Sequence, residues 1–152
     1  MKKRHEVLFE QLRTYRSELL SLVDGLSDAE ADIIPERFNN NIRWNLGHVL
    51  LDQYLWIWVL AKEDVLIPSG FSEWFGFGTA PSHFTDTTPK LSTLVELLRE
   101  QPDLIQGRYH DRMEEEFAPT DMGIITIEQV LIRTIFHEGL HIGAIQALKR
   151  SL

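Results

Sequence analysis

The sequence predicts an all-α fold, a four-helix bundle that forms a single domain over residues 1–152. Long segments place apolar residues at alternating gaps of four and three, which aligns them on one face of an α-helix. No segment shows the strict apolar and polar alternation of a half-buried strand. Hydrophobic residues at 43% and charged residues at 25% are ordinary for a folded soluble domain of 152 residues. We therefore expect helices packed around one core.

The first half of the chain predicts two long helices. The first covers about residues 5–26 and is followed by Ser27-Asp28-Ala29-Glu30, a capping-box pattern that predicts a short helical turn before Pro35. The asparagines at 39–41 offer N-cap chemistry for a second long helix over about residues 42–64. We expect its inward face to carry Trp44, His48, Leu51, Leu55 and Trp58.

Residues 65–88 form a long connection rich in proline, glycine and aromatic residues, in which no helical or strand period survives. Such a length is unusual in a compact domain and indicates either a crossover between distant ends of the bundle or a lid. We favour a long crossover that leaves the second and third long helices parallel. Its aromatic residues are expected to anchor it to the bundle, and the alternative is that they form a cage around a ligand.

The third long helix is expected to begin near Pro89 or Ser92, with a kink or break near Gln101 caused by Pro102. Its inward positions are Leu94, Leu98, Ile105, Tyr109, Met113 and Phe117. A second capping box, from Thr126 to Gln129, opens the last helix, which runs to the C-terminus. The inward stripe of this helix is predicted to be Val130, Thr134, His137, His141, Ala144 and Leu148.

Composition argues against several classes of partner. With a net charge of −8 the chain is a poor match for nucleic acid. Its most apolar run spans only residues 54–61, short of the about 20 residues that cross a membrane, so no membrane partner is expected. The N-terminus lacks an apolar signal-peptide core, and the absence of cysteine fits a reducing compartment, so we expect a cytoplasmic protein. Thiol chemistry would require a small-molecule thiol.

Three histidines occupy predicted inward positions. His137 and His141 lie one helical turn apart, close enough for one ion to contact both rings, and His48 comes from another helix. A divalent metal would satisfy their buried nitrogens and leave a fourth position open, as in catalytic zinc sites. Imidazole also suits nickel, iron and copper, so the metal is not identified. The alternative is a cluster of core histidines hydrogen-bonded to neighbouring side chains.

Two carboxylates lie close to these histidines in the sequence. Asp52 follows His48 by one turn and either accepts its second ring N–H or is a surface charge. Glu138 is a candidate either for a hydrogen bond that orients a ligand or for catalytic proton transfer to a metal-bound water, although adjacent helical side chains diverge by about 100°. The other histidines, His5, His83 and His110, are expected at the surface.

The segment from His137 to His141 also matches the H-E-x-x-H pattern of zinc peptidases. Such an enzyme would present a third ligand downstream and an edge strand that holds the peptide. Residues 142–152 contain no His, Asp or Glu, and no strand is predicted. A peptidase is therefore disfavoured.

Trp44-x-x-Gly47-His48 and His137-x-x-x-His141-x-Gly143 resemble the DinB/YfiT-like superfamily of metal-binding four-helix bundles. The resemblance covers essentially the whole chain. It implies a metal triad of His48, His137 and His141, an up-down-down-up topology and a homodimer. Some members are similar to transferases or isomerases that use a low-molecular-weight thiol. A glutamine often follows the last glycine of the family motif, whereas this chain has Ala144 there, which affects any shared substrate contact.

The leading hypothesis is a metal-dependent enzyme of thiol S-transferase or hydrolase type, in which zinc, nickel or iron activates a small thiol or water for attack on a small-molecule substrate. The alternative is a non-catalytic metal-binding or dimerisation module whose partner surface includes Trp56 and Trp74. In a third possibility, Gly47 and Gly143 only permit close helix packing and the histidines form a polar core cluster.

Overall fold

The structure, a computed structural model, describes residues 1–64 and 67–152, and every regular element in these ranges is helical. The prediction of an all-α fold is therefore confirmed. The elements are α1 (Lys3–Val23), α2 (Asp28–Asp32), α3 (Ile42–Ala61), α4 (Phe71–Phe75), the 3-10 helix η1 (Pro81–His83), α5 (Leu91–Tyr109) and α6 (Ile127–Lys149).

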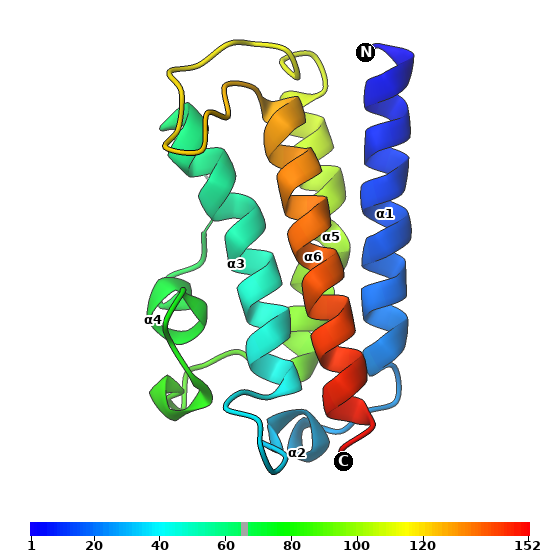
Figure 1. The fold of residues 1–152 in the computed structure, drawn as a ribbon, viewed down its shortest axis with the longest axis vertical. Coiled ribbons are helices and arrows are strands. Elements are labelled where there is room, and N and C mark those ends of the chain that lie inside the picture. Colours follow the sequence, from blue (N-terminus) through cyan, green and yellow to red (C-terminus); the bar gives the residue numbers. More distant parts are fainter. Residues whose placement is uncertain (65–66) are drawn as a thin grey trace.

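The long helices α1, α3, α5 and α6 lie side by side along the long axis of the molecule (Figure 1). Helices α1 and α6 run in one direction, and α3 and α5 run in the other (Figure 1). Helix α6 packs between α1 and α3, and α5 contacts the same two helices. This arrangement encloses one hydrophobic core to which every long helix contributes.

The connection between α3 and α5 contains more helix than the sequence indicated. Helix α4 begins after Gly70, whose φ of 85° is a left-handed conformation that suits glycine, and it buries Phe71 and Phe75 against α3. Figure 1 shows this segment lying alongside α3. The prediction that no helix forms here is wrong because five residues with two aromatic anchors are too short to show a helical period. Residues 65–66 of the predicted connection lie outside the described residues.

Helix α4 packs against α3 and increases the burial of its first part. From Ile42 to Tyr54 every residue of this helix is buried, so the helix has no polar face in that part. Helix α3 ends before Lys62, which adopts a left-handed conformation. Leu55 is only half-buried, and Trp58, expected to point inward, is 43% exposed because it lies beyond the covered part of the helix.

A buried ion pair connects α1 with α6. The Arg16 guanidinium donates from Nε to Glu138 Oε1 at 2.7 Å and from Nη2 to Glu138 Oε2 at 3.1 Å, and both residues are at least 98% buried. Its Nη1 donates to the carbonyl oxygen of Leu98 on α5 at 2.5 Å. One side chain therefore joins three of the four long helices.

The same contact explains how α5 accommodates proline. Pro102 lacks the N–H that would bond to the carbonyl of Leu98 four residues earlier, and Arg16 supplies that donor instead. Of the kink or break expected near Gln101, the break does not occur, since α5 continues from Leu91 to Tyr109. Met113 and Phe117 lie beyond its end, Met113 fully buried and Phe117 partly.

Among the described residues, none of the helices combines the length and the apolar character needed to span a membrane.

Replacing Arg16 with methionine should lower the free energy of unfolding by about 3–5 kcal/mol, because Glu138 would remain buried without a partner. Urea denaturation measures the loss. The double variant Arg16→Met/Glu138→Leu should recover most of it, since the unpaired charge is removed. Arg13→Met is the matched control, because its partner Asp103 is exposed, and it should cost at most about 1 kcal/mol. If both variants lost the same free energy of unfolding, the interpretation of Arg16 and Glu138 as a buried ion pair would be contradicted.

Candidate metal centre

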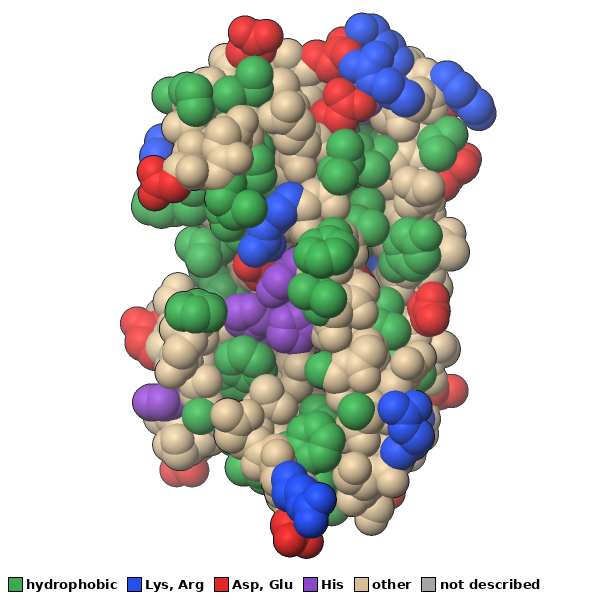
Figure 2. All heavy atoms as spheres, viewed as in Figure 1, with side chains coloured by type: hydrophobic (Ala, Val, Ile, Leu, Met, Phe, Trp, Pro, Cys, Tyr) green, Lys and Arg blue, Asp and Glu red, His purple; other side chains and the backbone are tan. Residues whose placement is uncertain are grey.

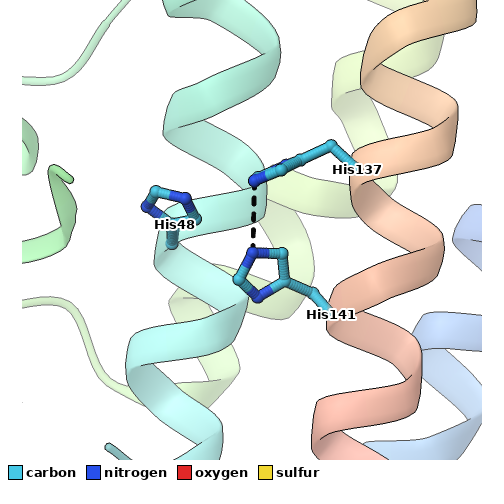
Figure 3. Close-up of side chains that lie close together, drawn as sticks. All are labelled: His48, His137 and His141. Carbon is cyan, nitrogen blue, oxygen red and sulfur yellow. Dashed lines mark hydrogen bonds between the residues drawn. The ribbon is translucent and has the colours of Figure 1, made fainter.

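Three histidine rings from α3 and α6 converge on one point (Figure 3). One ring nitrogen from each of His48, His137 and His141 lies within 4.8 Å of the others. In the buried interface between the helices, Gln53 Nε2 donates to Thr134 Oγ1 at 2.6 Å and helps to fix their relative level. The structure thus brings together the three histidines predicted from the sequence.

The Nδ1 atoms of His48 and His137 face oxygen acceptors. His48 Nδ1 lies 2.7 Å from the carbonyl oxygen of Phe75, and His137 Nδ1 lies 3.0 Å from Oδ2 of Asp52. A carbonyl or an ionised carboxylate offers no proton, so Nδ1 donates in both pairs. Each neutral ring therefore keeps its free lone pair on Nε2, as the ring of a metal-binding histidine does.

His141 is oriented in the same way by an amide. Its Nδ1 lies 2.7 Å from Oδ1 of Asn45. Asn45 Nδ2 donates to the carbonyl oxygen of Asn41 at 2.8 Å, which directs its oxygen toward the histidine. All three rings therefore present an Nε2 lone pair, and each is held by a different acceptor.

The Nε2 atoms of His137 and His141 lie 3.2 Å apart (Figure 3). Two lone pairs at this distance repel unless a proton or a cation lies between them. Burial, reinforced by His48 and His137, lowers the pKa of His141 to about 3, and burial also lowers the pKa of His48. His141 therefore does not supply such a proton at neutral pH. Two ligands at about 2.05 Å from a tetrahedral ion lie about 3.3 Å apart. The donor set therefore fits a divalent metal ion.

The site is open to solvent on one side. Figure 2 shows histidine side chains reaching the surface of a shallow hollow in the middle of this face. His48 is buried, whereas the His137 side chain is 16% exposed and His141 is half-buried. The α6 histidines, predicted to lie on the buried stripe, are therefore only partly buried. The buried positions of α6 are Ile127, Val130, Leu131, Thr134, Glu138, Ile142, Ile145 and Leu148.

Trp44 forms one wall of the site. Its indole stacks on His48 with centroids 4.7 Å apart and an interplanar angle of 11°. Its Nε1 donates to Thr79 Oγ1 at 2.9 Å, which ties the ring to the connection after α4. Sequence spacing predicted that Trp44 shares a helix face with His48. It did not predict the contact between Trp44 and Thr79, which is distant in the chain.

Asp52 pairs with His137 and Arg133, and its expected bond to His48 is not formed. Burial alone would raise the pKa of Asp52, but the hydrogen bond from His137 and the positive charge of Arg133 lower it, so the carboxylate stays ionised. His48 instead points Nδ1 toward the backbone of Phe75. The sequence analysis missed both the Phe75 carbonyl and Asn45, because nothing in the sequence around a histidine indicates which distant oxygen accepts its N–H.

Glu138 faces away from the histidine cluster. Both of its carboxylate oxygens accept from Arg16, so the structure does not bring this predicted catalytic residue to the site. His83 and His110 are exposed, as expected. The expectation for His5 is wrong: it is 4% exposed, and its Nε2 lies 3.6 Å from Oε1 of Glu128, because it faces the first turn of α6.

Comparison with families of known proteins places the chain in one of them. The sequence model described as the DinB superfamily matches residues 11–145, a range that includes all three histidines. No curated protein matches the chain.

Gly47 allows α4 to reach the site. A Cβ at this position would lie 2.3 Å from the Phe75 ring, so Gly47→Ala should displace Phe75 and remove the acceptor for His48. We expect a loss of about 1–3 kcal/mol in stability and roughly 10–100-fold in zinc affinity. Thermal denaturation and zinc titration measure the two effects.

Gly143→Ala is the control for this substitution, because a Cβ there meets no atom within 4 Å. It should leave zinc affinity unchanged and add up to about 1 kcal/mol through helix propensity. Unchanged zinc affinity in Gly47→Ala would show that the Phe75 carbonyl does not orient His48.

Proposed function

The chain belongs to the DinB superfamily, and on this premise we propose that it is a metal-dependent enzyme whose ion is held by His48, His137 and His141. The observation that carries the proposal is the convergence of three Nε2 lone pairs whose rings are each fixed through Nδ1. Zinc fits the spacing, and nickel or iron would also accept three imidazoles. The directions of the long helices support the up-down-down-up topology that we propose for the bundle (Figure 1).

A bound divalent ion would act as a Lewis acid that lowers the pKa of a small thiol or a water molecule. Three protein ligands leave a fourth position for that nucleophile. The chain has no cysteine, so a reacting thiol must come from a low-molecular-weight cosubstrate. Trp44 and the stacked His48 ring shield one side of the site, and the exposed edges of His137 and His141 admit a small molecule. We therefore propose thiol transfer to, or hydrolysis of, a small electrophile.

Metal analysis tests the first half of the proposal. Wild-type protein should retain about one divalent ion per chain, and His137→Ala should lose most of it because one of three ligands is removed. Mass spectrometry of the purified proteins measures the content. His110→Ala is the control, since this histidine is exposed and outside the cluster. Equal, near-zero content in wild type and His137→Ala would refute the metal site.

A panel of small thiols and electrophiles tests the second half. The metal-loaded protein should catalyse at least one thiol transfer or hydrolysis, and His137→Ala should not. Absence of activity throughout, with metal retained, would favour a non-catalytic metal-binding or dimerisation module.

An exposed apolar face of α6 supports the proposal that the protein forms a homodimer. Ile132, Phe136 and Leu140 are 56%, 68% and 57% exposed and recur every four residues on the outer side of the helix. A contiguous apolar face of this kind is typical of an interaction surface. Gly143 lies one turn beyond Leu140 and leaves open space above the backbone. The same face in a second copy would be self-complementary about a two-fold axis.

Phe136→Glu should shift the protein toward monomer, because the interface would bury an unpaired charge. Sedimentation velocity at several concentrations measures the change. Phe77→Glu is the control, since Phe77 is 99% exposed and lies outside α6. A wild-type protein that is monomeric at high concentration would reject the homodimer.

A further inference from the structure

We infer that Arg133 recognises a carboxylate on the small molecule that enters the histidine site. The inference rests on the proposed function and adds a substrate class to it: a thiol that carries a carboxylate rather than a neutral or cationic one.

Arg133 lies at the edge of the site, one helical turn before His137 on α6. Its Nη1 donates to Oδ2 of Asp52, and the same oxygen accepts from His137 Nδ1 at 3.0 Å. Its Cζ lies 4.3 Å from the ring centroid of Trp56, in a cation–π contact. A carboxylate on one side and an aromatic face on the other hold the guanidinium in place. An incoming ligand would therefore not have to immobilise a free side chain.

Most donors of this guanidinium remain available. An arginine carries five N–H donors, and within the described part of the chain only Nη1 of Arg133 has a hydrogen-bond partner, the Asp52 carboxylate. The side chain is 23% exposed, so solvent or a ligand reaches it. Orienting Asp52 requires one donor only, which a lysine would provide equally well. The planar fork that remains matches the geometry of a carboxylate.

The charge of the site favours the same ligand. Asp52 offsets the charge of Arg133, and the three neutral histidine rings do not offset the charge of a divalent ion. The loaded site is therefore a local positive region in a chain of net charge −8. An anionic ligand is attracted there, and a cationic ligand is repelled.

The test uses protein loaded with Co2+, whose visible absorption changes when a thiol binds. The probes are 3-mercaptopropionate, 2-mercaptoethanol and cysteamine, which are similar in size and carry an anionic, a neutral and a cationic group. We expect wild type to bind 3-mercaptopropionate more tightly than 2-mercaptoethanol, and Arg133→Gln to reduce this ratio about tenfold. Differences in thiol pKa cancel when one ratio is compared between two proteins.

Two further variants complete the design. Arg133→Lys should keep part of the preference, because it retains the charge without the fork. Arg150→Gln removes the same charge from the exposed end of α6 and should keep the full ratio. The Co2+ content and the absorption spectrum without thiol verify that each variant has an intact site.

The outcomes separate this inference from the proposed function. The inference is supported if Arg133→Gln loses the preference for 3-mercaptopropionate over 2-mercaptoethanol and Arg150→Gln keeps it. Thiol binding without a preference, or with a preference that Arg133→Gln retains, overturns the role of Arg133 and leaves the proposed function standing. If no thiol binds to the loaded wild type, the thiol-dependent function and the inference both fail.

Discussion

The rotation of α6 about its own axis is the constraint on which the site depends. Glu138 is pinned by Arg16 on the face of α6 that meets α1. Each residue along a helix turns the side-chain direction by about 100°, so three residues turn it by about 300°, which leaves it about 60° short of a full turn. Because His137 precedes Glu138 by one residue and His141 follows it by three, fixing Glu138 toward α1 turns both histidines to the same side, about 100° and 60° from Glu138 and about 40° from each other, toward α3. A small rotation of α6 would separate both rings from His48.

This constraint gives Glu138 a role that its position in the H-E-x-x-H pattern hides. The carboxylate is next to a proposed ligand in sequence, yet its buried pair with Arg16 occupies both oxygens. Replacing such a pair with apolar residues is often neutral for stability, so its value lies in the orientation that it imposes. The third contact, from Arg16 to the carbonyl of Leu98, adds α5 to the same arrangement. The pair thus fixes which face of α6 meets α1.

Local patterns predicted the helices and the three histidines, whereas contacts between distant segments had no signal in the sequence. The helical period of the sequence identified the extent of α6. It did not show that the buried face of this helix centres on Glu138, because the predicted face and the observed one both contain apolar residues at helical spacing. Asp52 was recognised as a ring partner through its distance from His48 along one helix. The observed partner is His137, which the relative level of α3 and α6 decides. Helix α4 could not be predicted, since its burial depends on the surface of α3 that it covers.

The connection after α3 is part of the site as well as a route between helices. The Phe75 carbonyl sits at the C-terminal end of α4, where helical carbonyls lack intrahelical donors, so His48 supplies a donor that this helix end needs. Thr79 holds Trp44, and Gly47 lets the Phe75 ring contact the α3 backbone. Three contacts therefore couple the position of this segment to His48. A shift of the segment would release His48 while leaving His137 and His141 in place, because their partners lie on α3. The α3 ligand is thus the one whose geometry depends on the crossover, and the α6 ligands depend on the packing of the long helices.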